Sequence, residues 1–151
     1  MDSVTFFACD EFWKDVRKLR KTIRADFLDC PYSDEEFEEL SCSQKMECLP
    51  ILRQISTVIK NKIDKLHEIP NNNKNANNQP FLSINFILWK LRWGVDNHGP
   101  AYGLRIMYCV QDKNVVFANI KHKKEVKDSE KIFQGETTER LTFFFSYNYK
   151  K

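Results

Sequence analysis

The first thirty residues change from a short apolar run to a helical repeat of apolar positions. Val4–Ala8 is rich in residues that favour strands, and it predicts a short strand. From Glu11 onward, apolar residues recur at steps of three and four, which predicts an amphipathic helix. We expect this helix to end at Cys30-Pro31, because proline cannot continue it. Its apolar face is Phe12, Val16, Leu19, Ile23 and Phe27, and the opposite side carries a continuous basic stripe of Lys14, Arg17, Lys18, Lys21 and Arg24.

Two further helices are predicted between residues 33 and 70. Ser33, followed three positions later by Glu36, is a capping-box pattern that predicts a short acidic helix over Asp34–Leu40. A longer helix should begin at Pro50, since proline suits the first helical turn, and end near Pro70. Its apolar face is Leu52, Ile55, Ile59, Ile63 and Leu66.

Asn71–Gln79 contains six asparagines in nine residues and cannot bury apolar surface. We interpret this segment, with residue 80, as a loop inside the domain. It separates a helical part, about residues 10–70, from a strand-rich part, about residues 84–151.

Beyond the loop the apolar period changes to two. Ile87, Trp89, Leu91 and Trp93 alternate with more polar positions, so both indoles should face the core while Lys90 and Arg92 emerge together on the opposite face. Two more strands are predicted over Leu104–Val110 and Val115–Ile120, joined by a tight turn at Asp112-Lys113-Asn114. The basic segment Lys121–Lys124 should then enter a short helix. The tail alternates again and predicts a last strand, with Leu141, Phe143, Phe145, Tyr147 and Tyr149 on one side.

These elements predict an α+β fold in one domain over residues 1–151. Each half alone would leave an apolar face uncovered, so the helices should pack on the sheet. A chain of 151 residues supports one core of this kind, and its 42% hydrophobic content is that of a globular protein. The sequence has neither an apolar run of membrane-spanning length nor a leader pattern, and we therefore expect a cytoplasmic protein. The five cysteines lack paired or zinc-ligand spacing, which favours reduced thiols.

Positive charge gathers in the second half of the chain. The net charge is only +3, but residues 81–131 hold nine Lys+Arg against five Asp+Glu. Residues 1–80 hold twelve against fourteen. This distribution favours an anionic partner for the strand-rich part.

Neighbouring antiparallel strands should bring Lys90 and Arg92 close to Arg105, while the third strand delivers His122, Lys123 and Lys124 at its exit. The sequence has no carboxylate pair at metal spacing, no Gly-rich phosphate loop and no nucleophile elbow. RNA cleavage needs none of these, because the 2′-OH is the nucleophile and fixed cations can stabilise the phosphorane. A histidine, or a lysine whose pKa is lowered by neighbouring cations, can transfer the protons. The alternative interpretation is a solvated basic surface without chemistry.

Three segments together resemble the RelE/HigB branch of type II toxins. They are Lys90-Leu91-Arg92, then Gly103-Leu104-Arg105-Ile106-Met107-Tyr108, then Asn119–Glu125, and the similarity covers about forty residues. Asp112 and Asp128 match the acidic positions of that pattern. The resemblance implies a RelE-like fold, with N-terminal helices packed on a twisted, mainly antiparallel sheet of four to five strands. It also implies an mRNA endonuclease that acts on ribosome-bound message without a metal or cofactor and is silenced by a cognate antitoxin protein.

The resemblance implies that Lys90, Arg92, Arg105 and Lys123 or Lys124 are basic active-site residues, and the charge pattern adds further candidates; His122 matches no fixed position of the family. The catalytic candidates are Arg105, Lys90, Lys123, Lys124 and His122, and which of His122, Lys123 and Lys124 acts as acid or base stays open. The RNA-binding candidates are Arg92, Tyr108, Lys121 and the helical stripe Lys14, Arg17, Lys18, Lys21 and Arg24. Two alternatives belong to other classes: a ParE-like toxin that binds DNA gyrase without cleavage, and an inactive RelE-fold binding protein.

Overall fold

The computed structural model describes residues 4–23, 28–68, 87–94, 103–111, 113–126 and 130–146. The predicted loop over residues 71–80, the connection over residues 95–102, Arg24, Asp112, Asp128 and the tail beyond Ser146 lie outside these ranges.

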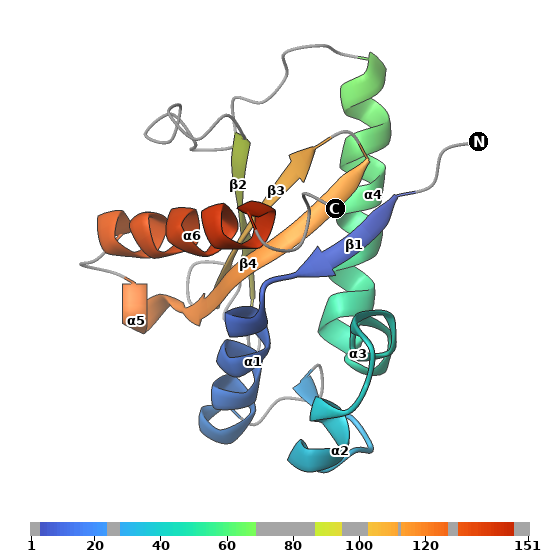
Figure 1. The fold of residues 1–151 in the computed structure, drawn as a ribbon, viewed down its shortest axis with the longest axis vertical. Helices are drawn as coiled ribbons and strands as arrows, with labels where there is room; N and C mark the ends of the chain where they lie inside the picture. Colours follow the sequence, from blue (N-terminus) through green and yellow to red (C-terminus); the bar gives the residue numbers. More distant parts are fainter. Residues whose placement is uncertain are drawn as a thin grey trace.

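Within the described ranges, four strands form one mixed sheet in the order β1-β4-β3-β2 (Figure 1). β2 (Ile87–Trp93), β3 (Leu104–Gln111) and β4 (Asn114–His122) form an antiparallel meander, and β1 (Thr5–Ala8) pairs in parallel with β4. The structure therefore confirms an α+β fold with a mainly antiparallel sheet of four strands. A register shift between Met107 and Tyr108 marks an irregularity in the pairing of β3 with β4.

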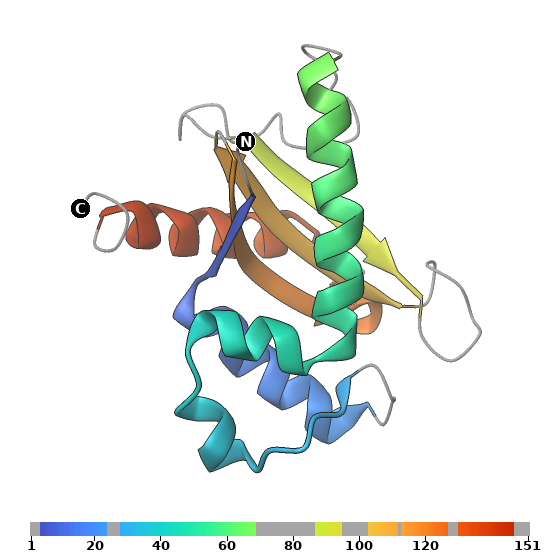
Figure 2. The ribbon, with the colours of Figure 1, turned by 90° about the vertical axis from the view of Figure 1, so that its right-hand side faces the viewer.

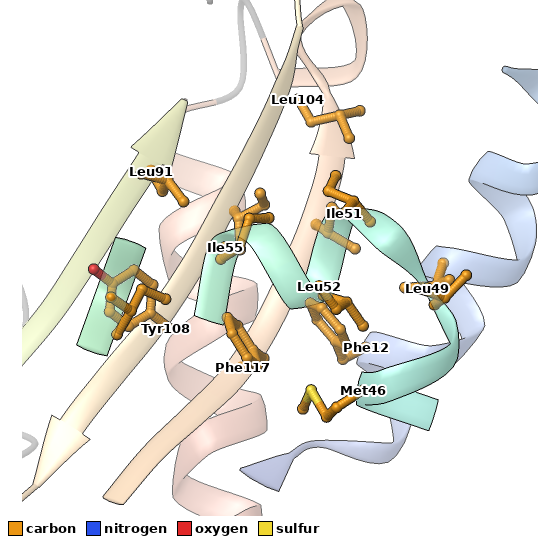
Figure 3. Packing of buried hydrophobic residues seen from close by; sticks show 14 of the residues in the cluster. Phe12, Met46, Leu49, Ile51, Leu52, Ile55, Leu91, Leu104, Tyr108 and Phe117 are labelled. Carbon is orange, nitrogen blue, oxygen red and sulfur yellow. The ribbon is translucent and has the colours of Figure 1, made fainter. Parts of the chain in front are cut away.

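One face of the sheet is covered by the helices of the first half. α1 (Asp10–Thr22), α3 (Cys42–Cys48) and α4 (Pro50–Glu68) lie on this face, and α2 (Asp34–Glu38) lies below α1 and α3 (Figure 2). The predicted apolar positions Leu52, Ile55 and Ile59 are fully buried, as is Phe12 on α1. Figure 3 shows Leu52 and Ile55 of α4 in one buried cluster with Tyr108 and Phe117 of the sheet. The helical spacing of apolar residues in the first half thus correctly predicted the helix faces that form the core between these helices and the sheet.

The opposite face of the sheet is covered by α6 (Glu130–Phe144), which contradicts the predicted last strand. Leu141 and Phe144 do not alternate on a strand. They pack beside Leu88 and Cys109 of the sheet, one helical turn apart. The prediction was wrong because the alternate positions Leu141, Phe143 and Phe145 fit a period of two. The positions that are buried, Phe133, Thr137, Leu141 and Phe144, follow a helical period instead.

Other boundaries also differ from the expectations. α1 ends at Thr22, eight residues before Cys30, and Ile23 is already extended. α3 was not predicted, although Ser41 and Gln44 form a capping box at its start. α2 ends at Glu38 rather than Leu40. β4 continues through Lys121 and His122, so these two residues belong to the strand, and α5 (Lys123–Val126) begins directly after it.

Candidate nucleic-acid interface

The basic residues of the second half meet at one end of the sheet. In the strand register Arg92 lies opposite Arg105, and Arg105 lies opposite Lys121. α5 is held at the same end, because the Lys123 backbone N–H donates to the Gly103 carbonyl (2.9 Å). The sequence-based expectation that these strands bring the cations together is therefore correct for their backbone positions.

Two cations of this row are turned into the protein rather than toward solvent. Arg105 is only 6% exposed, and its guanidinium donates to the Leu104 carbonyl (3.3 Å). Lys121 forms ion pairs with Asp15 (3.3 Å) and Glu136 (3.4 Å). Arg92 is the exposed member of the row. The cross-strand row therefore offers RNA less positive charge than its sequence indicates.

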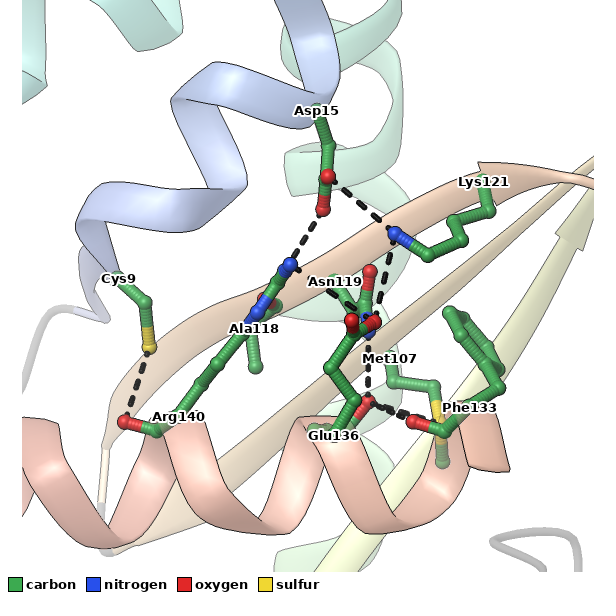
Figure 4. A network of polar contacts seen from close by, with 10 residues as sticks. Cys9, Asp15, Met107, Ala118, Asn119, Lys121, Phe133, Glu136 and Arg140 are labelled. Carbon is green, nitrogen blue, oxygen red and sulfur yellow. Dashed lines mark hydrogen bonds and ion pairs between the residues drawn. The ribbon is translucent and has the colours of Figure 1, made fainter. Parts of the chain in front are cut away.

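Lys121 belongs to a polar network that joins α1, β4 and α6 (Figure 4). Arg140 donates to Asp15 (2.7 Å) and to the Ala118 carbonyl (2.8 Å), so one guanidinium pairs with α1 and also satisfies the backbone of β4. Asn119 donates to Glu136 (2.9 Å). Sequence reasoning missed this network; the available signal was Asp15, an acidic residue between the buried positions Phe12 and Val16.

Glu136, a member of this network, has a shifted pKa. Its partial burial alone would raise the pKa of the carboxyl. The hydrogen bond from Asn119 and the charges of Lys121 and Arg140 outweigh that effect, and the pKa of Glu136 lies below its ordinary value. Glu136 therefore stays ionised and keeps Lys121 and Arg140 paired.

A pocket of about 300 Å³ lies between α1 and the exit of β4. It is lined by Lys18, Thr22, Ile23, His122 and Lys124. The Lys124 backbone N–H donates to Nδ1 of His122 (3.1 Å), which fixes the imidazole beside the strand exit. The structure thus brings His122 and Lys124 together with Lys18, a residue more than a hundred positions earlier in the chain.

The basic stripe of α1 is partly neutralised by α2. Arg17 forms ion pairs with Asp34 (3.5 Å) and Glu38 (3.6 Å), so its charge faces an acidic helix. Lys14, Lys18 and Lys21 remain exposed. The solvent-exposed part of the described stripe therefore consists of these three lysines.

The remaining candidates occupy separate places. Lys90 is half-buried on β2 opposite Met107, and Lys123 is half-buried at the start of α5. Tyr108 is 2% exposed in the main core, where its ring stacks on Trp89, and burial raises the pKa of its hydroxyl. Its position leaves almost no surface for RNA.

Burial keeps the thiols of Cys9, Cys42, Cys48 and Cys109 in their protonated form. Burial raises the pKa of Cys9 to about 12, burial together with the neighbouring Cys30 raises that of Cys48 to about 11, and burial also raises that of Cys109. All five cysteines are free. Within the described ranges, no three His, Cys, Asp or Glu side chains are grouped as metal ligands.

None of the described helices has the length and apolar character needed to cross a membrane. No family model, no curated protein and no solved structure matches this chain.

Proposed function

We propose that this chain is a RelE-like toxin that cleaves RNA without a metal, through attack of the 2′-OH on the adjacent phosphate. The observation that carries the proposal is the pocket that gathers Lys18, His122 and Lys124 from three different elements. Two ammonium groups and an imidazole around one cavity are the groups that metal-free phosphodiester cleavage requires. The proposed partners are mRNA, bound on the ribosome, and a cognate antitoxin.

We assign proposed roles to the basic residues according to where they lie. Lys18 and Lys124 line the pocket and are proposed to hold the scissile phosphate. Acid and base are assigned within His122, Lys123 and Lys124, which follow one another at the exit of β4. The half-buried Lys90 remains a catalytic candidate on β2. Exposed Arg92, Lys14 and Lys21 are proposed to contact the RNA backbone on either side.

Arg105 takes a different role from the one that the resemblance implies. At 6% exposure, with a hydrogen bond to its own strand, its guanidinium offers little surface to a phosphate. We propose that Arg105 is a positioning residue, which fixes the end of β3 opposite Lys121. The α+β fold supports the proposed toxin function, since an N-terminal strand and helices packed on a mainly antiparallel sheet are compatible with a RelE-like arrangement.

The test is cleavage of a labelled mRNA in the presence of a chelator, with and without ribosomes, by the purified protein. Lys18→Ala and Lys124→Ala should each lower the cleavage rate by about a hundredfold, as the loss of one transition-state donor does. Lys60→Ala, an exposed lysine on α4, is the matched control and should cleave like the wild type. Intact RNA in every condition would overturn the proposal.

Arg105 provides a second readout. Arg105→Ala should lower both the cleavage rate and the melting temperature. Arg105→Lys should recover more of the melting temperature than of the cleavage rate, because a point charge cannot reproduce the planar guanidinium. Loss of activity in Arg105→Ala with unchanged stability would return Arg105 to direct phosphate contact.

The burial of Arg105 and the ion pairing of Lys121 specifically favour a second candidate, a RelE-fold protein that acts by binding alone. In the ParE-like form of this candidate the target is DNA gyrase. Induced expression followed by mapping of RNA 5′ ends, with a parallel gyrase assay, separates the two. Growth arrest with intact RNA and inhibited supercoiling would select the binding toxin.

A further inference from the structure

Cys30 and Cys48 meet in the folded chain, although α2 and most of α3 lie between them in sequence. Cys30 lies in the connection between α1 and α2, and Cys48 is the last residue of α3. Their thiols are in hydrogen-bond contact, and no bond joins the two sulfur atoms. Burial, and after it the nearby Cys30 thiol, raises the pKa of Cys48 to about 11. The fold thus places two reduced thiols side by side.

The backbone is held close to both cysteines. Leu28, two residues before Cys30, is 1% exposed, and Leu49, directly after Cys48, is fully buried. Both leucines belong to the core between the helices and the sheet, and both cysteines pack against that core. The packing that stabilises the fold therefore also keeps the two thiols together.

Exposure separates this pair from a second pair of neighbouring thiols. Burial and the nearby Cys9 raise the pKa of Cys109, but these two residues are only 3% and 0% exposed. Cys30 and Cys48 are half-buried, so a small reagent can reach them. The pair of Cys30 and Cys48 is thus open to chemistry, whereas the other pair is sealed in the core.

We propose that Cys30 and Cys48 form a modification site, which a small-molecule disulfide converts into an intramolecular disulfide. One protein thiol loses its proton, and its thiolate attacks a sulfur atom of the reagent, whose S–S bond breaks and releases one thiolate. The second protein thiol then loses its proton, attacks the mixed disulfide and releases the other half of the reagent. The two released thiolates take up the two protons. Two protein thiols are thereby oxidised and one reagent disulfide is reduced to two thiols, without any part for RNA cleavage.

The new bond would close a loop that contains α2. In the reduced protein, Asp34 of α2 pairs with Arg17 (3.5 Å) and Arg20 (3.7 Å) of α1 through partly exposed side chains, and such pairs contribute little to stability. A disulfide around this segment would instead remove conformational freedom from the unfolded chain. Oxidation should therefore raise the melting temperature by about 5–10 °C.

The test uses oxidised glutathione on the whole folded chain, at about pH 8.5, where more thiolate is present. The mass should fall by that of two hydrogen atoms. Digestion after glutamate cuts at Glu39 and Glu47 and so places Cys30, Cys42 and Cys48 on separate peptides. The peptides of Cys30 and Cys48 should be joined, the melting temperature should rise, and dithiothreitol should reverse both changes.

Variants and unfolding give the controls. Cys30→Ser and Cys48→Ser should each show neither the link nor the rise in melting temperature. Cys42→Ser is the matched control, because Cys42 is also half-buried but donates to the Phe6 carbonyl (3.9 Å), and it should oxidise like the wild type. In denaturing urea the yield of the link should fall at least about threefold, because closure of an unfolded chain favours the nearer pair Cys42 and Cys48.

Three results would overturn the inference. The first is a wild-type protein that keeps separate glutathione adducts on Cys30 and Cys48 while it is folded. The second is a link that involves Cys42 or joins two protein molecules. The third is a Cys30–Cys48 link that forms equally well in urea and in the folded protein, since the contact in the fold would then play no part in its formation.

Discussion

Replacing Arg140 by methionine tests whether the polar network holds α1, β4 and α6 together. The guanidinium is 11% exposed and its partner Asp15 is 12% exposed, with 2.7 Å between Nη1 and Oδ2. Methionine keeps the aliphatic length but removes the ion pair and the hydrogen bond to the Ala118 carbonyl. Breaking a buried ion pair destabilises a protein by about 3–5 kcal/mol. An unsatisfied carbonyl adds to this loss, but Asp15 keeps its contact with Lys121. We therefore expect Arg140→Met to lower the free energy of unfolding by about 3 kcal/mol.

The assay is urea denaturation followed by circular dichroism. With a slope of about 2 kcal/mol/M, the midpoint should fall by about 1.5 M. Lys131→Met, on the exposed side of the same helix, is the matched control and should change stability by less than about 0.5 kcal/mol. When Arg140→Met is combined with Asp15→Asn, the loss in free energy of unfolding should be smaller than the sum of the two single losses, by about 1 kcal/mol or more. A loss below about 1 kcal/mol for Arg140→Met would show that the pair behaves like a surface salt bridge, and the reasoning would be refuted.

Three further outcomes are expected. Gly103→Ala should unfold the protein or lower its melting temperature sharply in calorimetry, because a Cβ there would lie 1.6 Å from the Trp93 carbonyl oxygen; a near-native melting temperature would contradict this. Because the pKa of Glu136 is lowered on folding, its stabilising contribution is present above the ordinary carboxyl pKa of 4.5 and is lost as pH falls through the folded value. Glu136→Gln should accordingly be less stable than wild type at pH 7, with a gap that narrows below pH 4.5 in urea titrations, and a gap that widens on acidification would show the opposite sign. If Lys14, Lys18 and Lys21 contact RNA, replacing all three by glutamate should weaken binding and flatten its salt dependence, whereas reversing the paired Arg17 should change the slope little; an unchanged slope for the triple variant would leave the stripe as solvated surface.

The elements that sequence reasoning predicted correctly are those whose burial follows a local period. Trp89 and Leu91 are buried on one face of β2, and Ile55 and Ile59 are buried on one face of α4. The C-terminal helix was misassigned because three consecutive phenylalanines satisfy both periods, so the local pattern could not distinguish a strand from a helix.

The candidate site was predictable only in part, because its completion depends on tertiary contacts. The register of β2, β3 and β4 follows from their alternation, and it places Arg92, Arg105 and Lys121 in one row. The counter-charge for Lys121 comes from α1 and α6, at Asp15 and Glu136. No spacing within a single element indicates such partners. The pocket has the same origin, since Lys18 and His122 meet only after α1 has packed beside β4.

The parallel pairing of β1 with β4 has a consequence for how the chain folds during synthesis. Thr5 lies opposite Asn114, so the first strand waits for a partner 109 positions later. α6, which covers the second face of the sheet, is made later still. Contacts between residues so far apart in sequence form slowly, because the intervening chain loses conformational entropy before the contacts begin to stabilise the fold. A nascent chain therefore holds an unpaired first strand until β4 has left the ribosome, and an uncovered apolar sheet face until α6 has followed it. In this interval the chain is most exposed to aggregation and to proteases.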